Sequence, residues 1–355
     1  MIRFLLKKVF YSLSILAGVA VLVFLLFQGM GDPARMAMGQ SGDAKTLRTI
    51  QQEMNLIDQD GKAIPVVKQF LLYLNDLSPI SVYQSEEIEQ KKIRGLFFGT
   101  DRMLVLKWPY LRRSFQSKRS VSELLLQALP GTLILALSSM LIAIAMGVPL
   151  GAMAAIRQNS WLDRASVFIG TMGISAPSFF VGLIVIYLFG FIWNDWTGLA
   201  VAGNWYSLDE NGRSVLTFQN LILPAVTIGI RPLSIIVQLT RSAMLDVLGQ
   251  DYIRTARAKG LSARHIYLKH ALPNAMNPVI TAITGWFAEL LAGAFFIEYI
   301  FGWEGVGKIT VDALEKLDYP VVMGSVMLSA TLFTLVNILS DWMQARLDKR
   351  IRVDH

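Results

Sequence analysis

Long stretches without charged side chains limit the fold of this chain more than any other feature of its sequence. A helix needs about 20 consecutive apolar residues to cross a hydrocarbon core about 30 Å thick. Six stretches qualify, at residues 9–31, 124–156, 165–194, 218–240, 270–297 and 319–340. Only the fourth and the fifth contain a charge, Arg231 and Glu289 respectively. Because irregular backbone and open sheet edges cannot face lipid, we predict an all-α integral membrane protein with six transmembrane helices.

The composition agrees with a membrane protein and argues against several other classes. The 355 residues are 54% hydrophobic and 17% charged, whereas soluble domains are about 45–50% apolar and about a quarter charged. There are no cysteines, and the three histidines have no ligand-like spacing, so we expect no disulfide, metal or cofactor. The net charge of +7 could suit nucleic acid, but its distribution suits membrane topology better, and we expect no nucleic-acid partner.

Positive charge gathers in alternate short connections and predicts the orientation of the chain. The basic residues of one set are Arg3, Lys7, Lys8, Arg157, Arg164, Arg241, Arg254, Arg257, Lys259, Arg264, Lys269, Arg346, Lys349, Arg350 and Arg352. The opposite connections are acidic, with Asp195, Asp209, Glu210, Glu298, Glu304, Asp312, Glu315 and Asp318. Cytoplasmic loops are enriched in Lys and Arg, so we expect both termini to be cytoplasmic. Residues 32–123 are basic too, but connections longer than about 60 residues translocate largely regardless of charge, so we place them outside.

Residues 32–123 are predicted to form a small mixed extracytoplasmic domain between the first two transmembrane helices. Helices are expected at 44–54 and, after Pro65, at 66–74, and the highly charged stretch 84–94 is expected to be a solvated face. Such a domain could cap the transmembrane helices or dock a partner, and the sequence leaves both open. The first apolar stretch exceeds the roughly 7–15 residues of a signal peptide, so we expect it to be retained.

The connection between the fourth and fifth stretches predicts a short helix. Asp251 suits an N-cap and Gly260 suits the position that follows a C-cap, which gives about two turns. Ser262 can begin a second helix that runs toward Leu272 and Pro273.

One face of this short helix is predicted to be apolar. Leu248, Tyr252 and Ala256 follow one another at intervals of four residues, and Ala256 and Gly260 leave a notch on the same side. A helix of this kind suits the groove of another protein. Its basic flanks equally suit a helix lying on anionic lipid, and the residues alone do not separate the two.

A resemblance favours the first alternative. The segment resembles the cytoplasmic loop of binding-protein-dependent ABC permeases, whose pattern is Glu-Ala-Ala, three residues, Gly, nine residues, Ile, one residue and Leu-Pro. Ala256, Gly260 and Leu272-Pro273 fit that spacing, while Arg254, Thr255 and His270 depart from it. The local variant is similar to the dipeptide/oligopeptide/nickel permease family, and so are the segments 31–34, 239–245, 302–307 and 318–322. Residues 79–113 look longer than the usual loop, and Glu304 stands where proline is common.

The resemblance implies a type I ABC importer permease fold in the bacterial inner membrane, with no catalytic activity of its own. The implied partners are a second homologous permease, two cytoplasmic ATPases, an extracytoplasmic solute-binding protein and membrane lipid. The short helix would sit in a groove of one ATPase through Tyr252, Arg254, Thr255, Ala256, Lys259 and Gly260. Di- or oligopeptides are the leading solutes, and nickel chelates, glutathione-like peptides and oligosaccharides are alternatives within the family.

Two charges within predicted spans are candidates for the translocation path. Charged residues at such positions usually face a protein interior or a watery cavity. Arg231 and Glu289 could therefore line the path and contact a charged solute. Alternatively, they could form a structural salt bridge, or Arg231 could simply lie near the outer boundary of the membrane. Residues 302–308 imitate a phosphate-binding loop, but that motif requires Ser or Thr next and Ile309 follows, so we expect no nucleotide site.

A secondary transporter is the main competing interpretation, and a channel or insertase subunit is the third. A secondary transporter often shows two repeated halves with broken helices at the midplane, and no such repeat is present in the sequence. We therefore predict the following division. Residues 1–31 form the cytoplasmic N-terminus and first helix, 32–123 the extracytoplasmic domain, 124–345 the five-helix core with its coupling loop at 241–272, and 346–355 the cytoplasmic tail.

Overall fold

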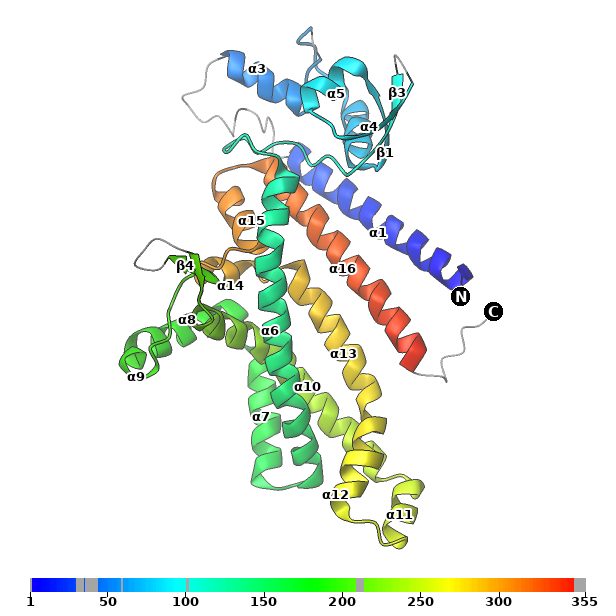
Figure 1. Cartoon of the computed structure of the whole chain (residues 1–355), viewed down its shortest axis with the longest axis vertical. Coiled ribbons are helices and arrows are strands. Elements are labelled where there is room, and N and C mark those ends of the chain that lie inside the picture. Colours follow the sequence, from blue (N-terminus) through cyan, green and yellow to red (C-terminus); the bar gives the residue numbers. More distant parts are fainter. Residues whose placement is uncertain are drawn as a thin grey trace. The chain divides into compact units, whose positions relative to one another are not determined.

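A computed structural model describes residues 2–29, 35, 44–58, 60–99, 102–208 and 214–347 (Figure 1). The segment 31–34, Asp209, Glu210 and the tail beyond residue 347 lie outside the described residues. The chain divides into two compact units. The larger unit contains residues 1–4, 130–308 and 332–355, and the smaller unit contains residues 5–129 and 309–331.

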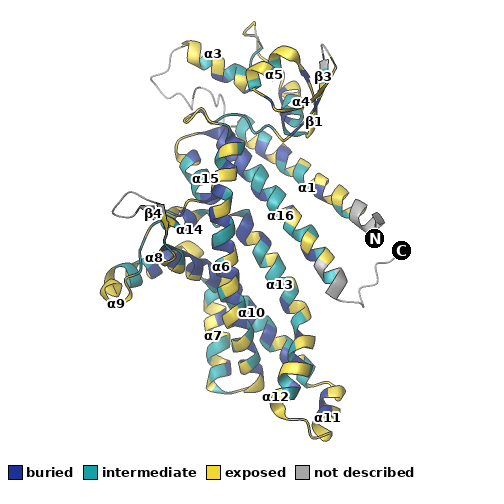
Figure 2. Cartoon of the chain, viewed as in Figure 1, coloured by how far each residue is buried: buried dark blue, intermediate teal, exposed yellow. Residues whose placement is uncertain are grey.

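Four described helices are long and apolar enough to cross a membrane. They are α1 (Ile2–Gly29), α6 (Val121–Ile156), α10 (Gln219–Leu248) and α16 (Tyr319–Leu347). Large apolar side chains stay exposed along them, such as Leu22 on α1 and Leu141 on α6, and Figure 2 shows exposed residues (yellow) along α1. Exposed leucines are expected where helices face lipid. The chain is therefore a multi-pass membrane protein.

The stretch 165–194 is broken in two, and the prediction of one continuous helix there is wrong. Helix α7 (Trp161–Ser175) meets α8 (Ser178–Tyr187) and the π-helical turn η2 (Leu188–Ile192) at 108°. Ala176 and Pro177 are both extended at the break, with ψ of 132° and 130°. Proline has no N–H to continue the helix, and it drives the preceding residue out of the helical region. This pair adds at most one bent span to the four straight ones.

The stretch 270–297 forms α13 (Leu272–Gly293), which is followed by the short helix α14 (Phe295–Ile300). With Pro278 in its interior, α13 runs for 22 residues, but it is not among the helices that meet the criteria for a span. The described residues thus give four spans, or five with the bent pair. Six spans remain a prediction.

The larger unit is packed around α10, which lies against α7, α8 and α13. The small-residue face of α6 lets α10 approach closely. A Cβ atom at Gly147 would lie 2.8 Å from Cγ2 of Ile236, and one at Gly151 would lie 2.5 Å from the carbonyl oxygen of Val237. The shared core includes Leu135, Met140, Leu223, Ile236, Val279, Phe301 and Trp303. Beyond α8, the short helix α9 (Asn194–Thr197) and the hairpin β4 (Tyr206–Leu208) and β5 (Ser214–Leu216) precede α10.

The smaller unit contains α1 and a mixed α/β segment. Its helices are α3 (Ala44–Glu53), α4 (Val66–Leu77) and α5 (Ser85–Lys91), so the helices expected at 44–54 and 66–74 are present. Its strands are β1 (Ile80–Gln84), β2 (Gly95–Phe98) and β3 (Arg102–Lys107), which form an antiparallel sheet in the order β1-β3-β2. The charged stretch 84–94 contains α5, which has no buried residue.

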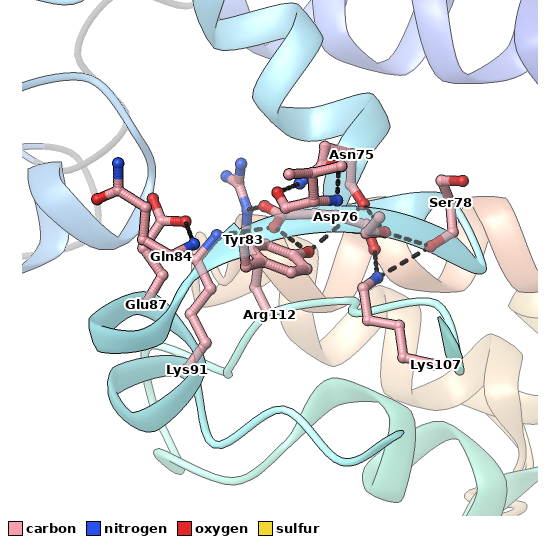
Figure 3. Close-up of polar contacts among 11 residues, drawn as sticks. Asn75, Asp76, Ser78, Tyr83, Gln84, Glu87, Lys91, Lys107 and Arg112 are labelled. Atoms are coloured by element: carbon pink, nitrogen blue, oxygen red, sulfur yellow. Dashed lines mark hydrogen bonds and ion pairs between the residues drawn. The ribbon is translucent and has the colours of Figure 1, made fainter. Parts of the chain in front are cut away.

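A buried carboxylate joins α4 to the sheet (Figure 3). Asp76 is 1% exposed, and its Oδ1 accepts hydrogen bonds from the Tyr83 hydroxyl at 3.0 Å and Lys91 Nζ at 2.8 Å. Nε of Arg112 lies 3.7 Å from the other carboxylate oxygen, and Lys107 Nζ donates to the Asp76 carbonyl oxygen at 2.5 Å. Buried charges need partners of this kind. These polar contacts therefore hold the sheet against α4.

Candidate functional site

The predicted coupling segment forms α11 (Asp251–Ala258), a helix of eight residues. Its N-cap is Gln250 rather than Asp251, because Gln250 is the last residue with extended backbone and Asp251 already lies in the first turn. The carboxylate of Asp251 suits that turn, where the helix dipole favours negative charge.

The helix ends as predicted at Gly260. This residue has a φ of +77°, which glycine adopts without a steric penalty. The N–H of Gly260 donates to the Arg257 carbonyl at 2.9 Å, and the N–H of Leu261 donates to the Ala256 carbonyl at 3.3 Å. These two bonds make a Schellman motif, which satisfies carbonyls that the helix end leaves free. A Cβ atom at Gly260 would meet nothing within 4 Å, so one side of the helix end is open.

The inner face of α11 differs from the predicted apolar stripe. Ile253 and Ala256 are buried against a cluster that includes Met244, Ile266 and Ala275. Tyr252, which the stripe placed inside, is 44% exposed. Its hydroxyl accepts a hydrogen bond from Asn274 Nδ2 at 3.0 Å. The buried face of α11 is therefore centred on Ile253 and not on Tyr252. Ala256, which was predicted to contact an ATPase, is covered by the core of its own chain.

The outer face of α11 is polar and basic. Arg254, Thr255 and Lys259 are exposed together with Tyr252 and Gly260. Five of the six predicted contact residues thus share the free surface of one helix. The following segment adds Leu261 and Leu268, which are exposed leucines that the sequence analysis did not single out.

Rigid elements hold α11 at the end of α10. After Gly260, the short helix α12 (Ala263–His265) has Ser262 at its N-cap and leads through the π-helical turn η3 (Ile266–Ala271) into α13. At the same end of α10, Arg241 forms two hydrogen bonds with the buried carboxylate of Asp163 on α7, one of them at 3.0 Å from Nη2. The apolar cluster that contains Met244, Ala256 and Ala275 therefore joins α11 to both α10 and α13.

The two charges within the predicted spans do not pair with each other in the part of the chain that the structure describes. Arg231 on α10 and Glu289 on α13 are both exposed. The Arg231 guanidinium lies 5.7 Å from the ring centroid of Trp286, a cation–π distance. A structural salt bridge, one of the alternatives, is therefore not formed among the described residues, and a role for either residue in the translocation path remains a prediction.

A carboxylate that the sequence analysis placed only in an acidic loop organises the segment 302–308. Glu298 is fully buried on α14. It accepts hydrogen bonds from the Thr132 hydroxyl at 2.8 Å and from the backbone N–H groups of Gly307 and Lys308 at 2.7 and 3.2 Å. These N–H groups open α15 (Val306–Glu315), and a helix N-terminus favours an anion. The loop that imitates a phosphate site therefore binds a carboxylate of its own chain.

The segment 318–322 also has a structural role, within the smaller unit. The carboxylate of Asp318 is buried and accepts hydrogen bonds from the Ser114 hydroxyl and from the backbone N–H of Phe115, the latter at 2.9 Å. The first turn of α16 is thereby tied to the segment that precedes α6.

Comparison with known proteins decides the family. The model of the binding-protein-dependent transport system inner membrane component matches residues 147–353, and the model of the N-terminal part of such membrane components matches residues 1–136. The chain belongs to this family of ABC importer permeases. Within it, the chain is of the dipeptide/oligopeptide type.

Two curated relatives match this permease along almost its whole length. The glutathione transport system permease protein GsiC of Salmonella choleraesuis (strain SC-B67) is 34% identical over 353 residues, which cover 99% of both chains. The dipeptide transport system permease protein DppB of Escherichia coli (strain K12) is 33% identical over 370 aligned positions, with the same coverage. A solved structure of the MetNI methionine ABC transporter in an inward-facing conformation covers 64% of this chain and 98% of its own, at 15% identity and a TM-score of 0.47.

Proposed function

We propose that this chain forms half of the membrane pathway of an ATP-driven importer for di- or oligopeptides. Six helices cross the inner membrane, counting α13 and the bent pair α7–α8, and both termini are cytoplasmic. Residues 32–123 lie outside, residues 241–272 form the cytoplasmic coupling loop, and residues 346–355 form a cytoplasmic tail. A second homologous permease completes the pathway.

Peptides are proposed as the solute because of the two curated relatives. One is named for glutathione and the other for dipeptides, and both align with nearly the whole chain. Glutathione is itself a small peptide, so the two names indicate a common solute class. An extracytoplasmic binding protein would deliver the solute, which is supported by the description of the family as binding-protein-dependent.

Coupling to the ATPases is assigned to the outer face of α11. The observation that carries this assignment is the division of the helix into two faces. Ile253 and Ala256 fix it to its own chain, whereas Tyr252, Arg254, Thr255, Lys259 and Gly260 are free for a partner. An amphipathic helix in a groove is a recurrent recognition mode. ATP would be hydrolysed by two cytoplasmic partner subunits, and this chain would convert their closure into movement of α10 and α13.

The test is the substitution Gly260→Asp in transporters reconstituted with their ATPases and binding protein. A side chain at φ of +77° strains the helix end, and a carboxylate there would enter the space reserved for the partner. Peptide uptake and solute-stimulated ATP hydrolysis should both fall at least about tenfold, which corresponds to about 1.4 kcal/mol of lost coupling.

Gly198→Asp is the matched control. Gly198 also has a positive φ, of +58°, and open space around its Cβ position, but it follows α9. This variant should retain both activities. Retention of both activities by Gly260→Asp, or labelling of residues 254–260 from the external face, would refute the coupling assignment.

A further inference from the structure

The three-stranded sheet of the smaller unit has an apolar outer face. The pairing register aligns Ile80, Leu106 and Leu96 in one row and Val82, Leu104 and Phe98 in the next. Successive rows of this kind lie on the same side of a sheet, because side chains alternate along each strand. All six side chains are between 48% and 61% exposed. Single exposed apolar side chains are common on soluble proteins, but six in aligned rows form a contiguous apolar patch, which marks an interaction or membrane surface.

The opposite face of the same sheet is covered and holds both polar and apolar side chains. Ser81, Tyr83 and Lys107 are buried there, and their side chains bond to residues of α4 and of the turn that follows it, as Figure 3 shows for Tyr83 and Lys107. A sheet with one face in water has its apolar side inward and its polar side outward. This sheet instead carries apolar side chains on both faces, because Val105 is fully buried on the covered face with Tyr83 and Met103, so the exposed apolar face does not suit water.

The sheet begins beside the membrane-spanning helices of its own unit. On α4, Phe70 and Tyr73 stack against Phe24 of α1, with ring centroids 5.1 and 6.0 Å apart. Phe24 lies five residues inside the end of the span at Gly29, about 7 Å along the helix. Tyr73 also shares a buried cluster with Ala20 of α1, which is further inside, and with Met323 of α16, which is four residues inside its own span. The C-terminal half of α4 is therefore at the depth of apolar span residues.

The position of α4 determines which row of the apolar face lies nearest the membrane-spanning helices. Ile80 is only three residues beyond Leu77, the last residue of α4, and the Lys107 N–H bonds to the Pro79 carbonyl at 2.9 Å. The row of Ile80, Leu106 and Leu96 is consequently the one next to the spans. Trp108, which is 89% exposed, and Arg94 stand at this same end of the sheet. Tryptophan and arginine are the side chains that anchor protein surfaces at the membrane interface.

We propose that the outer face of the β1-β3-β2 sheet rests on the lipid bilayer, with the row of Ile80, Leu106 and Leu96 among acyl chains and Trp108 at the headgroups. The sheet thereby anchors the mixed segment beside α1 and limits its rotation. This contact is set by depth along α1, so it is expected for either orientation of the chain in the membrane.

Site-directed spin labelling tests this contact with partner subunits that carry no reactive cysteine. This chain contains none, so each variant adds a single labelling site. Leu106→Cys and Val82→Cys report on the apolar face, and Lys62→Cys, on an exposed polar loop, is the matched control. The assembled transporter is placed in nanodiscs of phosphatidylcholine and phosphatidylglycerol. Relaxation of each nitroxide is then compared between oxygen, which concentrates in acyl chains, and a water-soluble nickel chelate.

The Leu106 label should be more accessible to oxygen than to the nickel chelate, whereas the Lys62 label should show the opposite order. The Val82 label should lie between them, because its row is further from the spans. Equal behaviour of the Leu106 and Lys62 labels would overturn the proposal. So would shielding of Leu106 from both reagents, which would indicate a protein partner on this face.

A second measurement leaves the sheet unaltered. Brominated lipids quench tryptophan fluorescence at short range, so the quenched fraction of the unmodified transporter is compared with that of Trp108→Phe. Removal of Trp108 should reduce the quenched signal. An unchanged quenched signal would place Trp108 away from lipid and would count against the proposal.

Discussion

The backbone N–H of Gly307 donates a 2.7 Å hydrogen bond to the carboxylate of Glu298, a fully buried side chain. The two residues are held so closely that a Cβ atom at position 307 would lie 2.8 Å from Glu298 Oε2 and 2.7 Å from Cα of Phe295. The glycine at position 307 is therefore explained by close packing around a buried carboxylate.

Gly307→Ala should destabilise the permease by about 1–3 kcal/mol, since the added methyl group has no space and must displace its neighbours. Thermal unfolding of the purified protein in detergent measures the effect. Gly285→Ala is the control, because a Cβ atom there would meet nothing within 4 Å and alanine favours a helix. Equal unfolding temperatures for the two variants would contradict this account.

The ion pair of Asp163 with Arg241 should be strongly coupled, because the carboxylate is 4% exposed and shares two hydrogen bonds with the guanidinium. In a double-mutant cycle with Asp163→Asn and Arg241→Gln, each single change should destabilise, and the coupling energy should reach about 1–3 kcal/mol. The pair Arg254–Asp251 serves for comparison, since both side chains are at least 74% exposed. Its coupling energy should stay below about 0.5 kcal/mol, and a similar value for both cycles would contradict the role of burial.

Glu289 is expected to affect solute passage without affecting coupling. It is exposed on α13 and has no ion pair with Arg231 among the described residues. Glu289→Gln should lower peptide uptake several-fold while ATPase assembly is unchanged, because a charge in a predicted span contributes to a polar pathway. Uptake assays in proteoliposomes measure this, with the exposed Glu89→Gln on α5 as the control. Unaltered uptake and solute preference would remove Glu289 from the path.

Lys107 predicts a dependence of stability on alkaline pH. Burial lowers the pKa of Lys107 from 10.5 to about 8, although the nearby Asp76 carboxylate opposes the shift. Between these values the unfolded chain binds more protons than the folded one, so folding stability should rise with pH. This rise should end near pH 10. Tyrosine then ionises in the unfolded chain, whereas burial raises the pKa of Tyr110 in the folded chain from 10.0 to about 12, so the folded chain binds more protons and the trend reverses.

Unfolding temperatures between pH 8 and the ordinary tyrosine pKa of 10.0 measure this dependence. The rise with pH should be present in the unmodified protein and reduced in Lys107→Met, which keeps the length of the side chain and removes the charge. Lys62→Met, at an exposed position, should leave it unchanged. Identical pH profiles for the unmodified protein and Lys107→Met would contradict the shifted pKa.

Local features of the sequence predicted the end of α11 correctly, but they predicted the wrong residue at the centre of its buried face. Gly260 was identified because a helix that ends in the left-handed region needs glycine, and this requirement involves only neighbouring residues. The choice between Tyr252 and Ile253 as the inner residue depended on where α10 and η3 lie, so a stripe counted along the helix gave the wrong centre. The hydrogen bond from Thr132 to Glu298 joins residues 166 positions apart, and no local pattern predicts it.

The sequence alone determined that this chain enters a membrane, where four of its helices lie and how α11 ends, because transfer of apolar residues into lipid and glycine's backbone freedom act on short segments. Only the tertiary structure decided the 108° bend after α7, the burial of Ile253, the carboxylate inside the 302–308 loop and the apolar outer face of the sheet. Each of these arises where segments distant in sequence meet, and which side chains they cover depends on the packed arrangement as a whole.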